Sequence, residues 1–101
     1  MRQFTPYLFL LLAASFLYSC KSAKLSDAEE KQRIGEYFEA AAIYRKVYTK
    51  TPPAKRDLRG YIAFRMAECN RLINNTPRAT SAYMYALRYK YPDSIVNLRL
   101  G

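Results

Sequence analysis

The side chains of this chain of 101 residues offer little covalent chemistry. It contains no His, which excludes Ser–His and Cys–His nucleophile pairs and His-containing zinc sites. It also lacks a Gly-rich phosphate-binding loop. The thiol of Cys20 is the group whose position indicates a chemical modification, because Cys20 ends a long apolar segment. We therefore expect no enzyme, no metal site, no dissociable cofactor and no small-molecule substrate.

The segment before Cys20 has the features of a secretory leader. A positive charge at Arg2 precedes an apolar run from residue 7 to residue 18, which is too short to span a bilayer comfortably. Residues 17–20 (Leu-Tyr-Ser-Cys) resemble the lipobox of bacterial lipoproteins. That resemblance implies that residues 1–19 are a signal peptide and that Cys20 carries a diacylglyceryl lipid as a membrane anchor. The alternative is an uncleaved anchor helix with an incidental cysteine.

The chain is strongly basic, with 17 Lys and Arg against 8 Asp and Glu and a net charge of +9. Such a charge suits partners with acidic surfaces, among them anionic lipid, acidic protein and nucleic acid. We expect no nucleic-acid partner, because the basic residues are spread along the sequence and no recognised binding motif is present. With Cys20 lipidated, Cys69 has no disulfide partner, and we expect it to be a small buried apolar side chain.

Helical periodicity predicts an all-α fold after a linker at residues 20–25. The first helix is predicted over residues 27–34, with capping-box spacing between Ser26 and Glu29. A second helix is predicted over residues 37–50, and the prolines that follow it end it. Its predicted inward positions are Ala40, Ala41, Tyr44, Val47 and Tyr48.

Two further helices are predicted in the second half of the chain, and the start of another. The third helix spans residues 54–73, and the fourth begins at Thr76 as N-cap and runs to Lys90. A fifth begins near Ser94. The predicted inward positions are Leu58, Ile62, Met66, Cys69 and Ile73 in the third helix, and Ala79, Tyr83, Ala86 and Leu87 in the fourth.

The helix pairs carry a recurring pattern of small and aromatic residues. Ala28 precedes Ala40 by the same distance as Ala67 precedes Ala79, and a Tyr follows each second alanine after four positions. The pattern resembles the tetratricopeptide repeat, a helical hairpin of about 34 residues that stacks into an α-solenoid. The resemblance implies repeats at residues 26–52 and 54–92, with a third beginning at 94–101. An ordinary helical hairpin domain is the alternative.

Tetratricopeptide arrays bind partners on a concave face lined by the first helix of each pair. In the second pair this resemblance assigns four residues to that face, and an extended peptide could use its aromatic and Arg side chains as anchors. In the alternative reading the aromatic residues only cover the core and the charges are solvated. The four residues are Tyr61, Phe64, Glu68 and Arg71.

Longer stretches resemble one family of lipoproteins. They are residues 24–48, Met-Ala-Glu-Cys at 66–69, Leu-Ile-Asn-Asn-Thr at 72–76, and Arg-Tyr-Lys-Tyr-Pro-Asp-Ser at 88–94. They resemble the amino-terminal region of Bacteroidota outer-membrane lipoproteins of the OmpA family, which join tetratricopeptide repeats to a β-propeller and an OmpA-like domain. One group of these tethers the type IX secretion machinery to peptidoglycan. The resemblance implies a protein–protein interaction scaffold in the envelope.

The residues after Cys20 and the end of the repeat pattern give expectations about location and extent. Residues 21–24 (Lys-Ser-Ala-Lys) contain no acidic sorting signal, so we expect an outer-membrane anchor that faces the periplasm. The family's peptidoglycan-binding residues lie in its distal domain, and none maps onto this sequence. Because the predicted third repeat stops at Gly101, we expect the chain to be the amino-terminal part of a longer protein. The alternative function is a glycan-capture lipoprotein of the starch-utilisation type.

Overall fold

The computed structural model describes residues 23–92 and 95–100, and in this part the chain is all-helical, as predicted. The predicted signal peptide and Cys20 lie outside the described residues. No helix in the described ranges is both long and apolar enough to cross a membrane. The helices are α2 (Leu25–Arg33), α3 (Tyr37–Lys50), α4 (Arg56–Leu72), α5 (Thr76–Arg88) and α6 (Ile95–Leu100).

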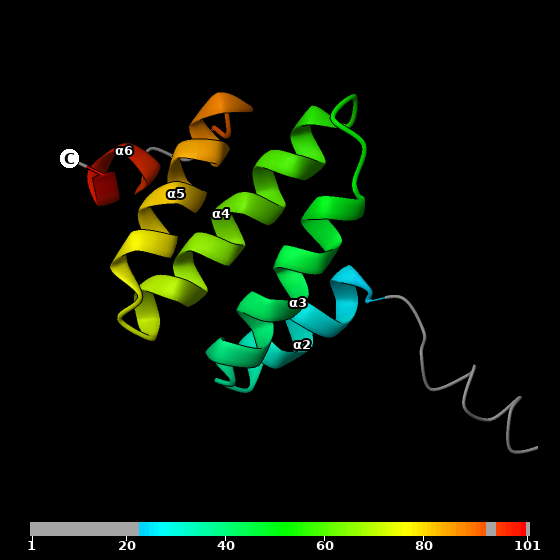
Figure 1. Ribbon diagram of the computed structural model, residues 1–101, viewed down its shortest axis with the longest axis vertical. Coiled ribbons are helices and arrows are strands. Elements are labelled where there is room, and N and C mark those ends of the chain that lie inside the picture. Colours follow the sequence, from blue (N-terminus) through cyan, green and yellow to red (C-terminus); the bar gives the residue numbers. More distant parts are fainter. Residues whose placement is uncertain (1–22, 93–94, 101) are drawn as a thin grey trace, which may run out of the picture.

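The helices follow one another in space in the order in which they occur in the chain (Figure 1). Helices α2 and α3 form one antiparallel hairpin, and α4 and α5 form a second. Helix α4 lies between α3 and α5 and packs extensively on both, while α6 packs on α5. Besides its contacts with α3 and α5, α4 has two further sides: Tyr61 and Glu68 lie on the one that contacts α2 and α6, and Met66 and Asn70 lie on the one between α3 and α5.

Helices α2, α4 and α5 end in turns of the same geometry. The residue with positive φ is Gly35 (86°) after α2, Asn74 (62°) after α4 and Lys90 (56°) after α5. In each turn two N–H groups return to carbonyls of the last helical turn, which is the hydrogen-bond pattern of a Schellman cap. These bonds join Gly35 to Gln32 and Glu36 to Lys31, Asn74 to Arg71 and Asn75 to Asn70, and Lys90 to Leu87 and Tyr91 to Ala86.

Small alanines and two tyrosines build the core where the helices cross. Alanine lets helix backbones approach closely, and the two tyrosines, Tyr44 and Tyr83, are buried in the same core. The Tyr44 hydroxyl donates to Gln32 Oε1 at 2.7 Å, so this buried polar group is satisfied. Cys69 is buried as predicted, and its burial raises the pKa of its thiol to about 11. The buried alanines include Ala28, Ala40, Ala67 and Ala79.

The starts of three helices differ from the sequence-based prediction. Helix α2 begins at Leu25, and its N-cap, Lys24, makes no side-chain capping bond, so the predicted capping box does not form. Helix α4 begins at Arg56, two residues later than predicted. Helix α5 is capped by Asn75 rather than by Thr76, because Asn75 Oδ1 accepts the backbone N–H of Arg78 at 3.3 Å.

Two leucines predicted to point inward are exposed instead. Leu87 is 36% exposed, because Ala79, Ala82, Tyr83 and Ala86 already form the buried side of α5. Leu58 is 37% exposed and lies in the first turn of α4, where burial begins only at Gly60. Both errors come from judging an apolar residue by type, when small residues set which side of the helix packs.

Candidate functional site

The four residues predicted to bind a partner lie on the side of α4 that faces α2 and α6. We call this side, together with the groups that contact it, the paired face, because its polar atoms bind one another. Its members on α4 are Tyr61, Phe64, Arg65, Glu68 and Arg71, with Glu29 from α2, Tyr83 from α5 and Arg99 from α6.

Glu68 is the centre of the paired face. Its Oε2 accepts Arg71 Nη2 at 2.8 Å, and its Oε1 accepts the Tyr83 hydroxyl at 3.0 Å and Arg99 Nε at 3.5 Å. Burial disfavours the carboxylate, since the side chain is only 13% exposed, but the hydrogen bonds and the two cations outweigh burial. The pKa of Glu68 therefore lies below its usual value, and the carboxylate links α4, α5 and α6.

The two aromatic residues of the predicted site are also occupied within the chain. Phe64 is 8% exposed, and its ring stacks on Tyr91 with a centroid distance of 4.7 Å. The Tyr61 hydroxyl donates to Glu29 Oε2 at 3.0 Å and accepts Arg65 Nε at 3.2 Å. The structure therefore brings Glu68 and Arg71 together, joins Tyr61 to α2, and makes Phe64 part of the core.

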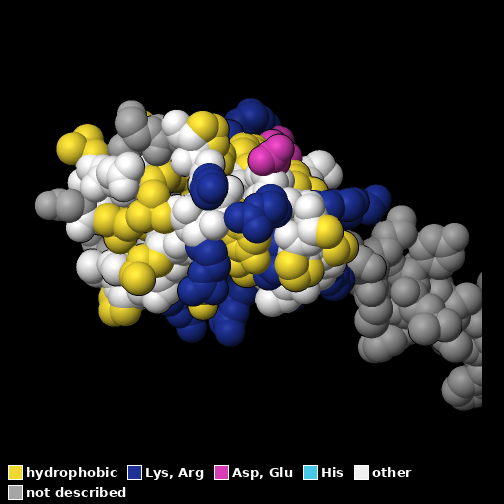
Figure 2. Space-filling model, turned by 90° about the horizontal axis from the view of Figure 1, so that it is seen from above, with side chains coloured by type: hydrophobic (Ala, Val, Ile, Leu, Met, Phe, Trp, Pro, Cys, Tyr) yellow, Lys and Arg dark blue, Asp and Glu magenta, His cyan; other side chains and the backbone are white. Residues whose placement is uncertain are grey.

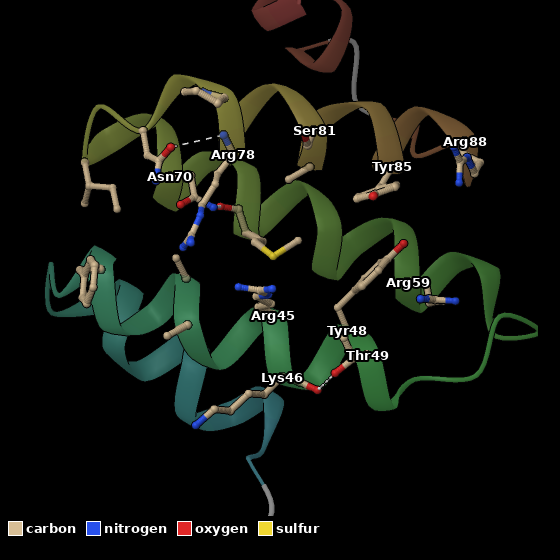
Figure 3. Close-up of a pocket in the computed structure, with 18 of the residues that line it drawn as sticks. Arg45, Lys46, Tyr48, Thr49, Arg59, Asn70, Arg78, Ser81, Tyr85 and Arg88 are labelled. Carbon is tan, nitrogen blue, oxygen red and sulfur yellow. Dashed lines mark hydrogen bonds between the residues drawn. The ribbon is translucent and has the colours of Figure 1, made fainter.

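The opposite side of α4 is the floor of a groove of about 1000 Å³ between α3 and α5 (Figure 3). We call it the α3–α5 groove. Met66 and the buried Asn70 lie on its floor, and Asn70 Nδ2 donates to the Met66 carbonyl at 3.0 Å. No Asp or Glu lines the groove among the described residues. Its cations are Arg45 and Lys46 from α3, Arg59 from α4, and Arg78 and Arg88 from α5.

None of these five cations forms an ion pair within the described residues. Figure 3 shows Arg78 reaching into the gap from α5 and Arg45 on the α3 side, whereas Lys46 points away from the gap. Figure 2 shows Lys and Arg side chains over and beside apolar surface, with little acidic surface on the face in view. The groove therefore combines cations that form no ion pair within the described residues with apolar side chains such as Phe38 and Met66.

Tyrosines and Arg59 close one end of the groove. The rings of Tyr48 and Tyr85 stack across it with a centroid distance of 5.8 Å. The Arg59 guanidinium carbon lies 4.2 Å from the centre of the Tyr48 ring and 5.3 Å from that of Tyr89. Burial raises the pKa of Tyr48, although the Arg59 charge acts against it, so the phenol is neutral at physiological pH. Aromatic faces thus hold Arg59 in place without a carboxylate.

Helical periodicity in the sequence does not indicate this groove. Its walls come from helices separated by the whole of α4, and each cation alone resembles a solvated surface charge. One signal was present: residues 40–56 and residues 69–92 contain no Asp or Glu. These two stretches include most of α3 and all of α5, the two walls.

Within the described ranges, no group of three or more His, Cys, Asp or Glu side chains could hold a metal ion. Comparison of the chain with models of protein families, with curated proteins and with solved structures finds no match. The helices offer two surfaces for binding: a face on which Glu68 pairs with Arg71 and Arg99, and a groove whose cations form no ion pair in the part of the chain that the structure describes.

Proposed function

We propose that the helices form a tetratricopeptide-like array that binds other proteins in a lipid-anchored assembly of the outer membrane. One observation carries the repeat: the turns after α2 and α4 have the same cap. A shift of 39 residues moves Gly35 onto Asn74, both with positive φ, and moves the two capping hydrogen bonds of one turn onto those of the other.

The packing supports the same proposal. The same shift moves buried Ala28 and Tyr44 onto buried Ala67 and Tyr83. Extensive contacts join helices that are neighbours in the chain, as in stacked repeats. The shift exceeds the usual repeat of about 34 residues, and the longer α4, with 17 residues against 9 in α2, accommodates the difference.

The anchor and its location form the second part of the proposal and rest on the sequence. Cys20 receives the lipid after cleavage behind residue 19, and the array faces the periplasm, where its partners belong to a type IX secretion-like, peptidoglycan-tethered complex. Growth of the native bacterium with a clickable palmitate analogue should label the full chain, and Cys20→Ala should abolish the label. Unchanged labelling of Cys20→Ala, or protease access in intact cells, would contradict this part.

The scaffold function is tested by photo-crosslinking in cells that express the full chain. A photoreactive residue replaces Phe38, which is exposed at the groove, and a second variant carries it at Tyr61 on the paired face. A third variant, at the exposed Lys50, is the control. We expect a discrete adduct with an envelope protein from at least one face and none from Lys50. Absence of adducts at both faces, with binding of starch oligosaccharides, would favour glycan capture instead.

A further inference from the structure

We infer that the α3–α5 groove binds an extended acidic segment of a partner protein. This inference rests on the proposed function as a protein-binding scaffold and assigns both the binding face and the chemistry of the partner. The face differs from the one predicted from the sequence, which lies on the other side of α4.

The charges of the groove favour a carboxylate ligand. Four of its five cations are Arg, and a planar guanidinium binds a carboxylate through two parallel hydrogen bonds. Arg45 and Arg78 are exposed and form no ion pair within the described residues, so binding breaks no existing pair. On the paired face, by contrast, an incoming carboxylate would compete with Glu68 for Arg71.

The shape of the groove favours a peptide segment. Helices α3 and α5 rise on both sides of the floor, so a planar membrane surface would meet the walls and leave the floor uncovered. Phe38, 71% exposed, and Tyr85, 37% exposed, add apolar surface to the lining. A segment that alternates acidic and aromatic residues would satisfy the cations and cover these rings together.

The test uses the full chain and a fluorescein-labelled peptide of alternating Glu and Tyr, with binding followed by fluorescence anisotropy. The groove variant combines Arg45→Gln with Arg78→Gln. The control combines Arg33→Gln with Lys50→Gln, which removes the same charge from exposed positions outside the groove. We expect the groove variant to bind about tenfold more weakly and the control to bind within about twofold of the parent chain. Equal loss in both variants, or no binding by the parent, overturns the inference.

Two further measurements separate the possible failures. Vesicles that contain anionic phosphatidylglycerol replace the peptide, and a larger loss of vesicle binding than of peptide binding in the groove variant overturns the inference in favour of a membrane surface. The photo-crosslinking is repeated in the groove variant. If the adducts are unchanged in the groove variant, the groove is not the binding face, although the proposed scaffold function still holds. If the adducts are lost only in the groove variant, the inference is supported.

Discussion

The two sides of α4 differ in how their charged side chains are paired. On the paired face, one carboxylate at Glu68 binds Arg71, Arg99 and the Tyr83 hydroxyl. In the α3–α5 groove, Arg59 lies against tyrosine rings, and within the described residues no carboxylate lines the cavity. The difference teaches that the charges of the described residues are not distributed evenly, because Glu68 pairs two cations on one side of α4, whereas no carboxylate among the described residues lines the other side.

This distribution separates charged side chains that stabilise the fold from charged side chains that can bind a ligand. A partly buried ion pair holds its elements in place and is costly to break on one side only. An exposed cation without a partner contributes little to the fold and keeps its capacity to bind an anion. The paired face should therefore affect stability, and the groove should affect binding.

The largest expected contrast comes from two tyrosines that lie two residues apart on α5. Tyr83 is buried and bonds Glu68, whereas Tyr85 lines the groove. Tyr83→Ala should lower the free energy of unfolding by about 3 kcal/mol, because it leaves a cavity and removes a hydrogen bond. Tyr85→Ala should cost only about 1 kcal/mol, because it loses the stack on Tyr48 but leaves no buried hydrogen-bonding group without a partner. Urea unfolding followed by circular dichroism measures both, and equal losses would remove the distinction between the two sides.

Glu68→Gln tests the charge on the paired face. Glutamine keeps the shape but loses the ion pairs, so we expect a loss of roughly 1.5 kcal/mol in the free energy of unfolding. The control is Glu30→Gln, which removes an exposed carboxylate paired with Arg33 on α2. It should leave the urea midpoint nearly unchanged. A Glu68→Gln protein as stable as the parent would mean that the carboxylate does not join the three helices.

The pH dependence of stability in the parent and in Glu68→Gln tests the same carboxylate. The pKa of Glu68 is lowered in the folded state, so its ionised form contributes stability at pH values above the unfolded pKa of about 4.3. That contribution should be lost as the pH falls through the lower, folded pKa. The stability difference between the parent and Glu68→Gln should thus be constant from about pH 7 to pH 5 and shrink below about pH 4. If this stability difference grew as the pH fell, the pKa of Glu68 would be raised in the folded state, not lowered.

The smallest effect is expected from charge reversal in the groove. Arg45→Glu places a carboxylate among cations that form no ion pair within the described residues, and it should raise the free energy of unfolding by about 0.5 kcal/mol at low salt. About 0.5 M NaCl should remove the gain by screening. Arg71→Glu on the paired face is the matched comparison and should destabilise, because it places a second carboxylate beside Glu68. Destabilisation by both reversals would show that the groove cations are also structural.

Much of the fold was predictable from local patterns. The bounds of α3 follow from periodic apolar residues and the prolines after it, and the turn at Gly35 follows from the need for positive φ. The helix starts were less predictable. Asn75 and Thr76 are both good N-cap residues, and only the backbone geometry selects Asn75.

The groove could not be derived from local patterns. Arg45, Arg59 and Arg78 lie on three different helices, and their placement around one groove depends on which side of each helix the alanines bury. Leu87 shows how easily that choice is misjudged from residue type. Conversely, Glu68 and Arg71 were predictable as neighbours, since a spacing of three residues places them on one side of a helix.

The shared caps after α2, α4 and α5 have a consequence for how such a protein could diversify. The turns after these three helices are fixed by backbone hydrogen bonds and one left-handed residue each, not by the side chains that line the groove walls. Architecture and recognition are therefore encoded in different parts of the sequence. Substitutions along the exposed sides of α3 and α5 would change what the surface selects while leaving the path of the backbone intact, so new specificities can arise without a new fold.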